Sequence, residues 1–339
     1  MPLTPTLAKL SAGEDLSLAE SRHAIDAVMS GRCPDEQIAQ LLTSLAAKGE
    51  TADEAAGAAA AMRSHMTPLR TTRAGLVDTC GTGGGGSRTF NVSTTAAIVA
   101  AAAGAPVAKH GNRSVTSRSG SADVLARLGV NIEAGVPQVE RCLEELGLCF
   151  CYAPLMHPAM KRVAAIRKRL GVRTLFNVLG PLANPAGAEH QLLGVGLPEM
   201  RPLLAGAIAR LGTRRTLVVS GADGLGDVSI TGPTQVTEVT ADATREYVWE
   251  PGDFGLEPGP LADLLIETPE QSAGVIRRVL AGEAGAARGI AVLNAAAALI
   301  AAGLESSPKP AAERAAAAID SGAGARLLQR LAELSHQPA

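Results

Sequence analysis

Five glycines in six positions, Gly81–Gly86, are the feature that most constrains how this chain folds. The run follows a short apolar segment, Leu76–Thr79, and precedes an Ala-rich apolar segment that begins near Ser93. Glycine tolerates positive φ and lets the backbone approach a ligand closely, and the N-terminus of a helix attracts anions. A strand, a glycine loop and a helix in this order therefore predict an anion-binding turn. Asn91, Ser93 and Thr94 would be the polar groups at the helix start.

The pattern of apolar residues changes at about residue 70. Residues 1–70 read as helices only, with capping boxes at Ser17–Glu20 and Thr51–Glu54. Beyond them, short apolar runs alternate with helical segments, and the candidate strands are Leu76–Thr79, Pro106–Lys109, Leu192–Val195 and Thr216–Ser220. This alternation is typical of an α/β domain with a mostly parallel central sheet. We expect a small N-terminal helical domain, 1–70 with a contribution from about 168–188, and a larger α/β domain, 71–339.

Composition narrows the class of function. The chain has 339 residues, a net charge of −2 and only 2% aromatic residues, so neither a basic face nor stacking rings favour nucleic acid as a partner. Its five cysteines include no CxxC pair, which argues against a zinc or disulfide framework. No secretory signal and no apolar run of about 20 residues is visible, so we expect a soluble, cytoplasmic protein with no membrane partner.

Two common nucleotide-binding motifs fit the glycine loop poorly. Gly81, Gly83 and Gly86 match GxGxxG, but a dinucleotide site needs an acidic residue about 20 positions on to hold a ribose. Lys109-His110 follows the next candidate strand instead. A Walker A loop is excluded because no Gly-Lys-Ser/Thr follows the glycines. A phosphate ligand without the dinucleotide is the better interpretation.

A second polar loop follows the strand Pro106–Lys109. Within ten residues it carries three cations, Lys109, Arg113 and Arg118, interleaved with the hydroxyl side chains of Ser114, Thr116, Ser117, Ser119 and Ser121. Fixed charges mixed with hydroxyl donors suit a diphosphate. Ligands of parallel sheets bind at the carboxyl ends of strands, where both loops begin. The two loops together therefore predict a diphosphate site.

Several longer motifs give the chain a more specific likeness. These are Gly81-Thr82-Gly83-Gly84, Thr89-Phe90-Asn91-Val92-Ser93-Thr94, Lys109-His110-Gly111-Asn112-Arg113, Gly120-Ser121-Ala122-Asp123 and Phe176-Asn177-Val178-Leu179-Gly180-Pro181-Leu182-Ala183-Asn184-Pro185. In this order and register the chain resembles the anthranilate phosphoribosyltransferases from about residue 15 to 330. The resemblance implies transfer of a phosphoribosyl group from phosphoribosyl diphosphate to the amine of anthranilate, in tryptophan biosynthesis. It also implies magnesium and a homodimer.

The resemblance assigns expected roles by position. Contacts to phosphoribosyl diphosphate would come from Gly81, Thr82, Gly84, Gly85, Thr89, Asn91, Ser93, Thr94, Lys109 and Ser121. Val92, Gly111, Arg113 and Ser117 would also be substrate-binding residues. The anthranilate channel would be lined by His110, Asn112, His157 and Arg167. Arg167, Lys109 and Asn112 would act in catalysis, and Ser93 and Asp227 would bind magnesium.

These residue types suit the implied chemistry. Anthranilate carries a carboxylate, for which the forked guanidinium of Arg167 is a fitting partner. Its aromatic amine is neutral at pH 7, so attack requires no strong general base. The barrier lies in the departure of diphosphate and in a cationic ribosyl transition state, which positioning, magnesium and fixed donors can stabilise.

Two positions depart from the pattern of the family. The glycine loop commonly has Asp where this chain has Gly85, and an adjacent Asp-Glu pair commonly stands where this chain has Gly226-Asp227. Magnesium is usually held by one or two carboxylates completed by water and substrate oxygens. We therefore expect weaker or fewer magnesium sites than in the rest of the family.

Two other functions stay open on the sequence alone. A pyrimidine nucleoside phosphorylase shares the architecture but uses free phosphate and a nucleoside, whereas Asn112, Arg167 and the two histidines favour a carboxylated aromatic acceptor. A non-catalytic relative that binds a ligand or nucleic acid would explain the lost carboxylates. The acidic charge balance and the scarcity of aromatics argue against the nucleic-acid version.

Overall fold

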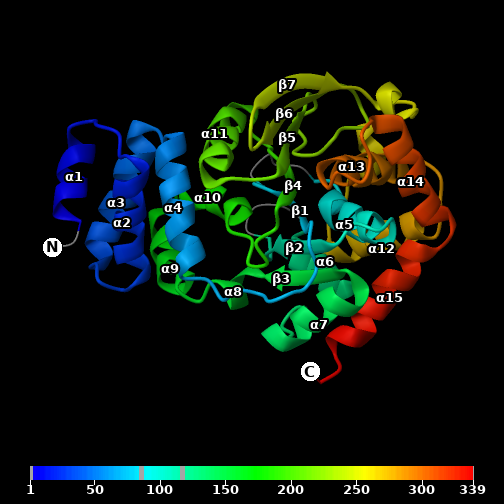
Figure 1. Cartoon of the computed structure of the whole chain (residues 1–339), viewed down its shortest axis with the longest axis horizontal. Coiled ribbons are helices and arrows are strands. Elements are labelled where there is room, and N and C mark those ends of the chain that lie inside the picture. The colour runs from blue at the N-terminus through cyan, green and yellow to red at the C-terminus, as the bar shows by residue number, and fades with distance from the viewer. Residues whose placement is uncertain (1–2, 84–87, 115–118, 339) are drawn as a thin grey trace.

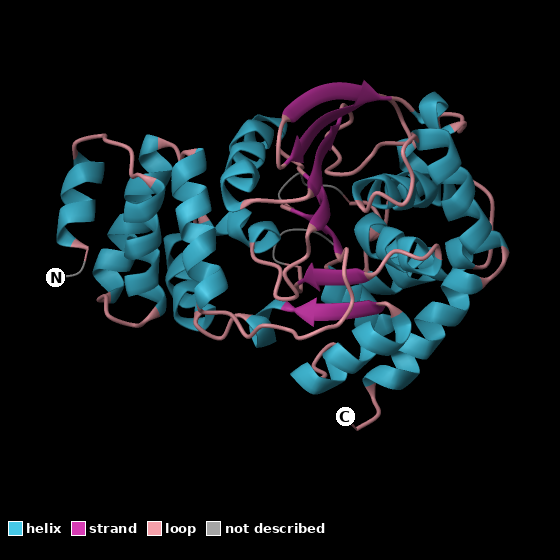
Figure 2. Ribbon diagram, in the orientation of Figure 1, coloured by secondary structure: helices cyan, strands magenta, loops and turns pink. Residues whose placement is uncertain are grey.

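The computed structural model describes residues 3–83, 88–114 and 119–338. Figure 1 shows a cluster of helices, α1 to α4, beside a central sheet whose other side is covered by α5 and α12 to α15. The strands pass through the middle of the larger part, between helices on both faces (Figure 2). The expected fold class, a small helical part and a larger α/β part with a mostly parallel sheet, is confirmed.

The elements follow one another along the chain as helices, then alternating strands and helices, then helices again. The N-terminal helices are α1 Thr4–Ser11, α2 Leu18–Met29, α3 Asp35–Lys48 and α4 Ala52–Ser64. The middle of the chain forms β1 Val77–Gly81, α5 Val92–Ala102, β2 Val107–Gly111, α6 Ser121–Arg127, α7 Val136–Leu146, β3 Leu148–Tyr152, α8 Ala153–Met156, α9 Met160–Leu170, α10 Phe176–Leu179, β4 His190–Gly194, α11 Arg201–Leu211, β5 Arg215–Gly221, β6 Thr234–Thr240 and β7 Thr244–Trp249. The C-terminal helices are α12 Pro269–Leu280, α13 Ala286–Ala301, α14 Pro308–Asp320 and α15 Ala323–Ser335.

The seven strands form one sheet in the order β3-β2-β1-β4-β5-β6-β7. The first five in this order are parallel, and β6 and β7 add an antiparallel edge. The four candidate strands correspond to β1, β2, β4 and β5, within two residues at each end. The candidates did not include β3, β6 and β7. β6 and β7 mix Thr and charged residues with apolar ones, so their apolar signal is weak. β3 is a fully buried apolar run as long as β1, β2 and β4, so its length does not explain the omission.

Two hydrophobic cores lie on opposite faces of the sheet. Side chains alternate along a strand, so Leu192 on β4 enters one core and Leu193 enters the other. The first core contains α5 and α13, in which Ile290–Ala301 is buried on every side. The second core joins the sheet to α11, α9, α10 and the N-terminal helices. Alanine-rich helices fit this arrangement because small side chains let helix axes approach the sheet and each other closely.

The capping boxes predicted at the starts of two N-terminal helices are confirmed. Ser17 and Glu20 begin α2, and Thr51 and Glu54 begin α4. Glu54 does more than cap its own helix. Its fully buried carboxylate also accepts a hydrogen bond from the Leu16 backbone N–H at 3.0 Å, which ties the start of α4 to the start of α2.

The segment around α9 and α10 packs against the N-terminal helices. Arg162 on α9 pairs with Asp35 on α3 at 2.7 Å and donates to the Cys33 carbonyl at 2.8 Å. Arg63 on α4 donates to the Leu182 carbonyl at 2.7 Å. These contacts cross what the sequence suggests is a domain boundary, and the boundary at about residue 70 stays a prediction.

Among the described residues, no helix is long and apolar enough to cross a membrane. The five cysteines are all buried free thiols.

The contact between α2 and α4 depends on Gly57. A Cβ added there would lie 2.9 Å from both the Arg22 backbone N and the Ser21 Cβ of α2, closer than such contacts normally come. Gly57→Ala should therefore lower the free energy of unfolding by about 1–3 kcal/mol, since overpacking forces the helices apart. Gly274 inside α12 is the matched control, because a Cβ there meets nothing closer than 3.8 Å.

Gly274→Ala should raise the free energy of unfolding by about 0.5–1 kcal/mol, the usual gain inside a helix. Denaturant titration of both variants measures the two changes. If both variants were stabilised, the close approach of α2 and α4 would be wrong.

Candidate functional site

The carboxyl ends of the parallel strands meet at one edge of the sheet, and glycines end all four of the strands predicted from the sequence. Gly81 ends β1, Gly111 ends β2, Gly194 ends β4 and Gly221 ends β5. Gly81 and Gly194 are register partners, and the Thr82 N–H donates to the Gly194 carbonyl at 2.9 Å. Because glycine has no side chain, the loops after these strands can approach the sheet edge closely.

The helix after the glycine loop begins as the sequence predicts. Asn91 is the N-cap of α5, and its Oδ1 accepts the Thr94 N–H at 3.0 Å. Its Nδ2 donates to the Ser119 carbonyl at 3.2 Å, so the same side chain joins the first loop to the second. The Thr94 hydroxyl is buried without a partner among the described residues, and Val92 is a buried apolar residue of the first turn.

Lys109 is the central cation of this edge. Its side chain, on β2, is almost fully buried, and its Nζ donates to the Thr79 carbonyl of β1 and to the Ser93 hydroxyl of α5, the latter at 3.1 Å. The ammonium group therefore lies between two strands and the N-terminus of the helix. Burial lowers the pKa of Lys109, and the nearby carboxylate of Asp78 opposes that shift.

Asp78 was not among the residues proposed from the sequence. It is fully buried on β1, and its Oδ1 accepts the His110 N–H at 3.1 Å. Burial raises the pKa of Asp78, and Lys109 is the strongest opposing influence. The two charges therefore stabilise each other inside the sheet. A carboxylate in an otherwise apolar strand, Leu76-Val77-Asp78-Thr79, was the sequence signal that could have identified it.

The start of the second loop is packed tightly around Gly111. A Cβ on Gly111 would collide with the Ser121 hydroxyl and lie 2.8 Å from the Phe150 ring, so the loop can close only over glycine. Ser121 begins α6 and donates to the Asn112 carbonyl at 3.3 Å. Arg113 is engaged by the protein, since it pairs with Asp123 at 3.1 Å.

The two predicted acceptor-site histidines meet in the structure. His110 Nε2 lies 3.2 Å from His157 Nε2, and His110 Nδ1 lies 3.0 Å from the Gly180 carbonyl. Burial lowers the pKa of His110 to about 3 and that of His157 to about 4, so both imidazoles are neutral at pH 7. Because a carbonyl only accepts, His110 carries its proton on Nδ1, and His157 donates from Nε2 to His110.

Arg167 lies on α9. Its guanidinium donates to Asn177 Oδ1 at 3.1 Å and lies 5.9 Å from the centroid of the Phe176 ring. Burial lowers the pKa of Arg167. Neither neighbour carries a charge.

Asp227 follows β5 in a loop that closes over the sheet edge. Burial raises its pKa to about 7, against the opposing influence of Lys109. The neighbouring position, Gly226, has no room for a side chain. A Cβ added there would lie 2.9 Å from the Gly196 backbone N. An aspartate at position 226 would therefore require the backbone to move, so the lost carboxylate is built into the packing of this loop.

Of the remaining residues predicted to contact a ligand, one is described by the structure and three are not. Thr89 is buried and forms an isolated antiparallel bridge with Leu265, which holds the chain after the glycine loop. Gly84, Gly85 and Ser117 lie outside the described residues.

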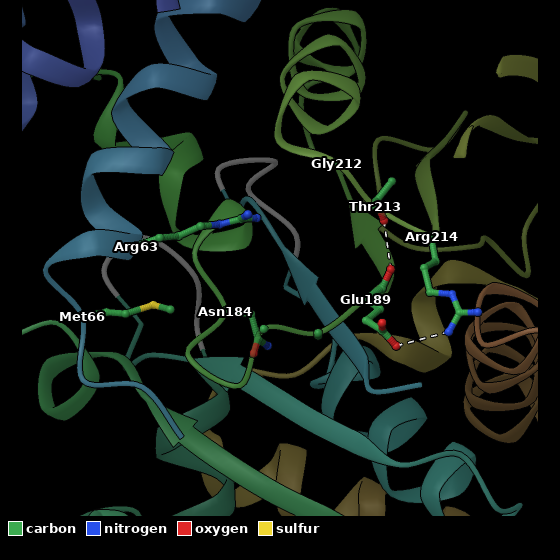
Figure 3. Close-up of a pocket in the computed structure, with 9 residues that line it drawn as sticks. Arg63, Met66, Asn184, Glu189, Gly212, Thr213 and Arg214 are labelled. Carbon is green, nitrogen blue, oxygen red and sulfur yellow. Dashed lines mark hydrogen bonds and ion pairs between the residues drawn. The ribbon is translucent and has the colours of Figure 1, made fainter. Parts of the chain in front are cut away.

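One cavity lies away from these residues. It has a volume of about 320 Å³ and is lined by Arg63, Met66, Asn184, Gly187, Ala188, Glu189, Gly212, Thr213 and Arg214 (Figure 3). Glu189 and Arg214, which form an ion pair at 3.5 Å, directly precede β4 and β5. The cavity therefore lies at the amino ends of the strands, opposite the edge that carries the predicted site residues.

Two family profiles cover most of the chain. The "Glycosyl transferase family, helical bundle domain" matches residues 4–66, and the "Glycosyl transferase family, a/b domain" matches residues 73–325. Anthranilate phosphoribosyltransferase from Moorella thermoacetica is 48% identical over 329 residues, covering 97% of each chain. The chain belongs to the anthranilate phosphoribosyltransferase family.

Solved structures of the family have the same fold. The crystal structure of anthranilate phosphoribosyltransferase from Thermus thermophilus is 42% identical, with a TM-score of 0.92, covering 98% of this chain and 99% of that one. The Saccharomyces cerevisiae anthranilate phosphoribosyltransferase, in complex with PRPP and Mg, is 29% identical, with a TM-score of 0.89 and coverage of 98% and 97%.

The neutral histidine pair should make this member of the family sensitive to acid. A histidine whose pKa falls on folding has no effect on stability above its ordinary value of 6.5, where it is neutral in both states. As the pH falls from 6.5 towards 4, stability is lost because the unfolded chain takes up a proton that the folded chain does not. The lowered pKa of His157 should decrease the free energy of unfolding by about 2 kcal/mol when the pH falls from 7 to 5. His157→Gln should remove most of that loss.

Denaturant titrations at the two pH values measure the effect. His23→Gln, which changes an exposed histidine of α2, is the control and should lose as much stability as the parent. A His157→Gln variant with the parent's full pH dependence would show that His157 is not held neutral.

Proposed function

We propose that this protein transfers the phosphoribosyl group of 5-phosphoribosyl 1-diphosphate to the amine of anthranilate, giving N-(5-phosphoribosyl)anthranilate and diphosphate in tryptophan biosynthesis. The observation that carries the proposal is the buried ammonium of Lys109, held by the Thr79 carbonyl of β1 and by Ser93 at the start of α5. Family membership supports the same activity.

Phosphoribosyl diphosphate would bind where the two loops face each other. Lys109 supplies a fixed charge, and Ser93 and Thr94 supply hydroxyl groups at the N-terminus of α5. The link from Asn91 to the carbonyl of Ser119 holds the two loops together. Thr82, Thr89 and Ser121 would complete the contacts expected from the family, together with Gly84, Gly85 and Ser117, which lie outside the described residues.

Anthranilate would bind beside the histidine pair, with its carboxylate on Arg167. Arg167 is a half-buried cation whose protein contacts are an amide and an aromatic ring, so its remaining N–H groups can donate to a carboxylate of the ligand. Asn112 lies two residues beyond His110 and would line the same channel. The likeness to a Saccharomyces cerevisiae structure in complex with 4-fluoroanthranilate supports a site for this class of acceptor.

The reaction forms a bond from the anthranilate nitrogen to ribose C1 while the bond from C1 to diphosphate oxygen breaks. Lys109 would stabilise the negative charge that develops on the departing diphosphate. The neutral state of His110 and His157 suits the acceptor side, because a charged imidazolium would repel the cationic ribosyl transition state. Positioning of the two substrates supplies much of the remaining rate enhancement.

Magnesium fits this site only as an ion shared with the substrate. In the described residues, no group of three or more His, Cys, Asp or Glu side chains could hold a metal. Asp227 and the Ser93 hydroxyl can each offer an oxygen, with diphosphate and water oxygens completing the shell. When bound, magnesium would neutralise charge on the diphosphate. The expectation of weaker or fewer magnesium sites stays a prediction from the sequence.

The homodimer, the cytoplasmic location and the division into domains 1–70 and 71–339 stay predictions from the sequence.

The proposed activity is tested by mixing the protein with phosphoribosyl diphosphate, magnesium and anthranilate and following the loss of anthranilate fluorescence. We expect a loss that requires all three additions. Replacing phosphoribosyl diphosphate by inorganic phosphate and a pyrimidine nucleoside, and following release of the free base, tests the phosphorylase alternative. An enzyme that left anthranilate fluorescence unchanged at saturating concentrations would contradict the proposal.

A further inference from the structure

The arginines of α9 fall into two groups by their partners. Arg162 and Arg169 both pair with Asp35 of α3, at 2.7 and 3.2 Å. Arg167 makes no ion pair in the described part of the chain; its partners are Asn177 and Phe176. The chain therefore neutralises the arginines that hold α9 against α3, and leaves the charge of Arg167 uncompensated.

The orientation of the Asn177 amide is fixed by a second contact. Asn177 Oδ1 accepts the Thr174 N–H at 3.0 Å as well as the Arg167 Nη2–H at 3.1 Å. Both partners are donors, so the oxygen and not the nitrogen must face them. Asn177 therefore closes the turn before α10 and holds the guanidinium of Arg167 with one side-chain atom.

Position 177 is an asparagine, although an aspartate would also fit the turn. An aspartate would accept the same two hydrogen bonds and would close the turn equally well. It would also place a carboxylate against Arg167, where it would compete with any carboxylate from a ligand. Asparagine is the side chain that orients the guanidinium while leaving its charge available.

We propose that Asn177 is a positioning residue that sets acceptor specificity, because it aims the Arg167 guanidinium at the carboxylate of an aromatic acceptor without neutralising it. Phe176 assists by placing a buried ring beside the guanidinium. The inference rests on the proposed function for the identity of the acceptor, but its physical content is the recognition of a carboxylate by Arg167.

The test is Asn177→Asp, which keeps the shape of the side chain and adds one negative charge. Ala165→Asp is the matched control. It adds the same charge to an exposed position of α9 two residues from Arg167, a spacing at which helix side chains do not face each other. Anthranilate binding is titrated directly through its fluorescence, so this measurement does not depend on turnover. Thermal unfolding reports on the fold, and KM is measured for both substrates.

We expect Asn177→Asp to raise the anthranilate dissociation constant about fivefold to tenfold, as a competing carboxylate beside a half-buried arginine should. The thermal midpoint and the KM for phosphoribosyl diphosphate should not change, and Ala165→Asp should behave as the parent. If Asn177 only closes the turn, Asn177→Asp will bind anthranilate within twofold of the parent, and the proposal is overturned. Equal losses for both substrates would also overturn it, because they would indicate general disruption.

Failure of the proposed function has a different signature. A parent protein that binds anthranilate but does not consume it would contradict the proposed activity. Weaker anthranilate binding by Asn177→Asp would still support the positioning role of Asn177.

Discussion

The buried ammonium of Lys109 is the interaction on which the candidate site depends. It joins β2 to the Thr79 carbonyl of β1 and to Ser93 at the start of α5, so one side chain fixes the relative positions of two strands and a helix N-terminus. Burying a charge is costly unless it is compensated, and Asp78 inside the sheet supplies the opposite charge. The ammonium group is thereby held in place by the sheet itself before any ligand binds, whereas a cation on a loop would have to be ordered by the ligand.

The proposed acceptor side of the site contains neutral imidazoles in place of a buried charge pair. His110 and His157 are held neutral by burial, and the Gly180 carbonyl determines which nitrogen of His110 carries the proton. The segment that supplies this carbonyl also supplies Asn177, which holds Arg167. A single stretch of chain between α9 and β4 thus contacts both His110 and Arg167, the uncharged and the charged group of the proposed acceptor site. The proposed chemistry requires a positive group, Lys109, near the diphosphate and neutral groups, the two histidines, near the ribosyl carbon.

Much of this site could be predicted from the sequence because strand, loop and helix boundaries are local. Gly81, Asn91 and Ser121 each lie at the end of a strand or the start of a helix, and the structure places them there. Contacts between distant segments could not be predicted. The pairing of His110 with His157 and the steric reason for Gly226 depend on how strands and loops meet in space. Asp78 was missed because a carboxylate inside an apolar strand gains its meaning only from the cation on the neighbouring strand.

The central claim is that the fixed charge of Lys109 makes this sheet edge a diphosphate site. Calorimetric titration of phosphoribosyl diphosphate with magnesium tests it most directly, using a double variant, Asp78→Asn with Lys109→Met, that removes both buried charges and leaves neither uncompensated. The account predicts that the double variant folds and binds about tenfold to a hundredfold more weakly than the parent, the usual effect of losing a charged hydrogen-bond donor. A folded double variant with an affinity within threefold of the parent would contradict it.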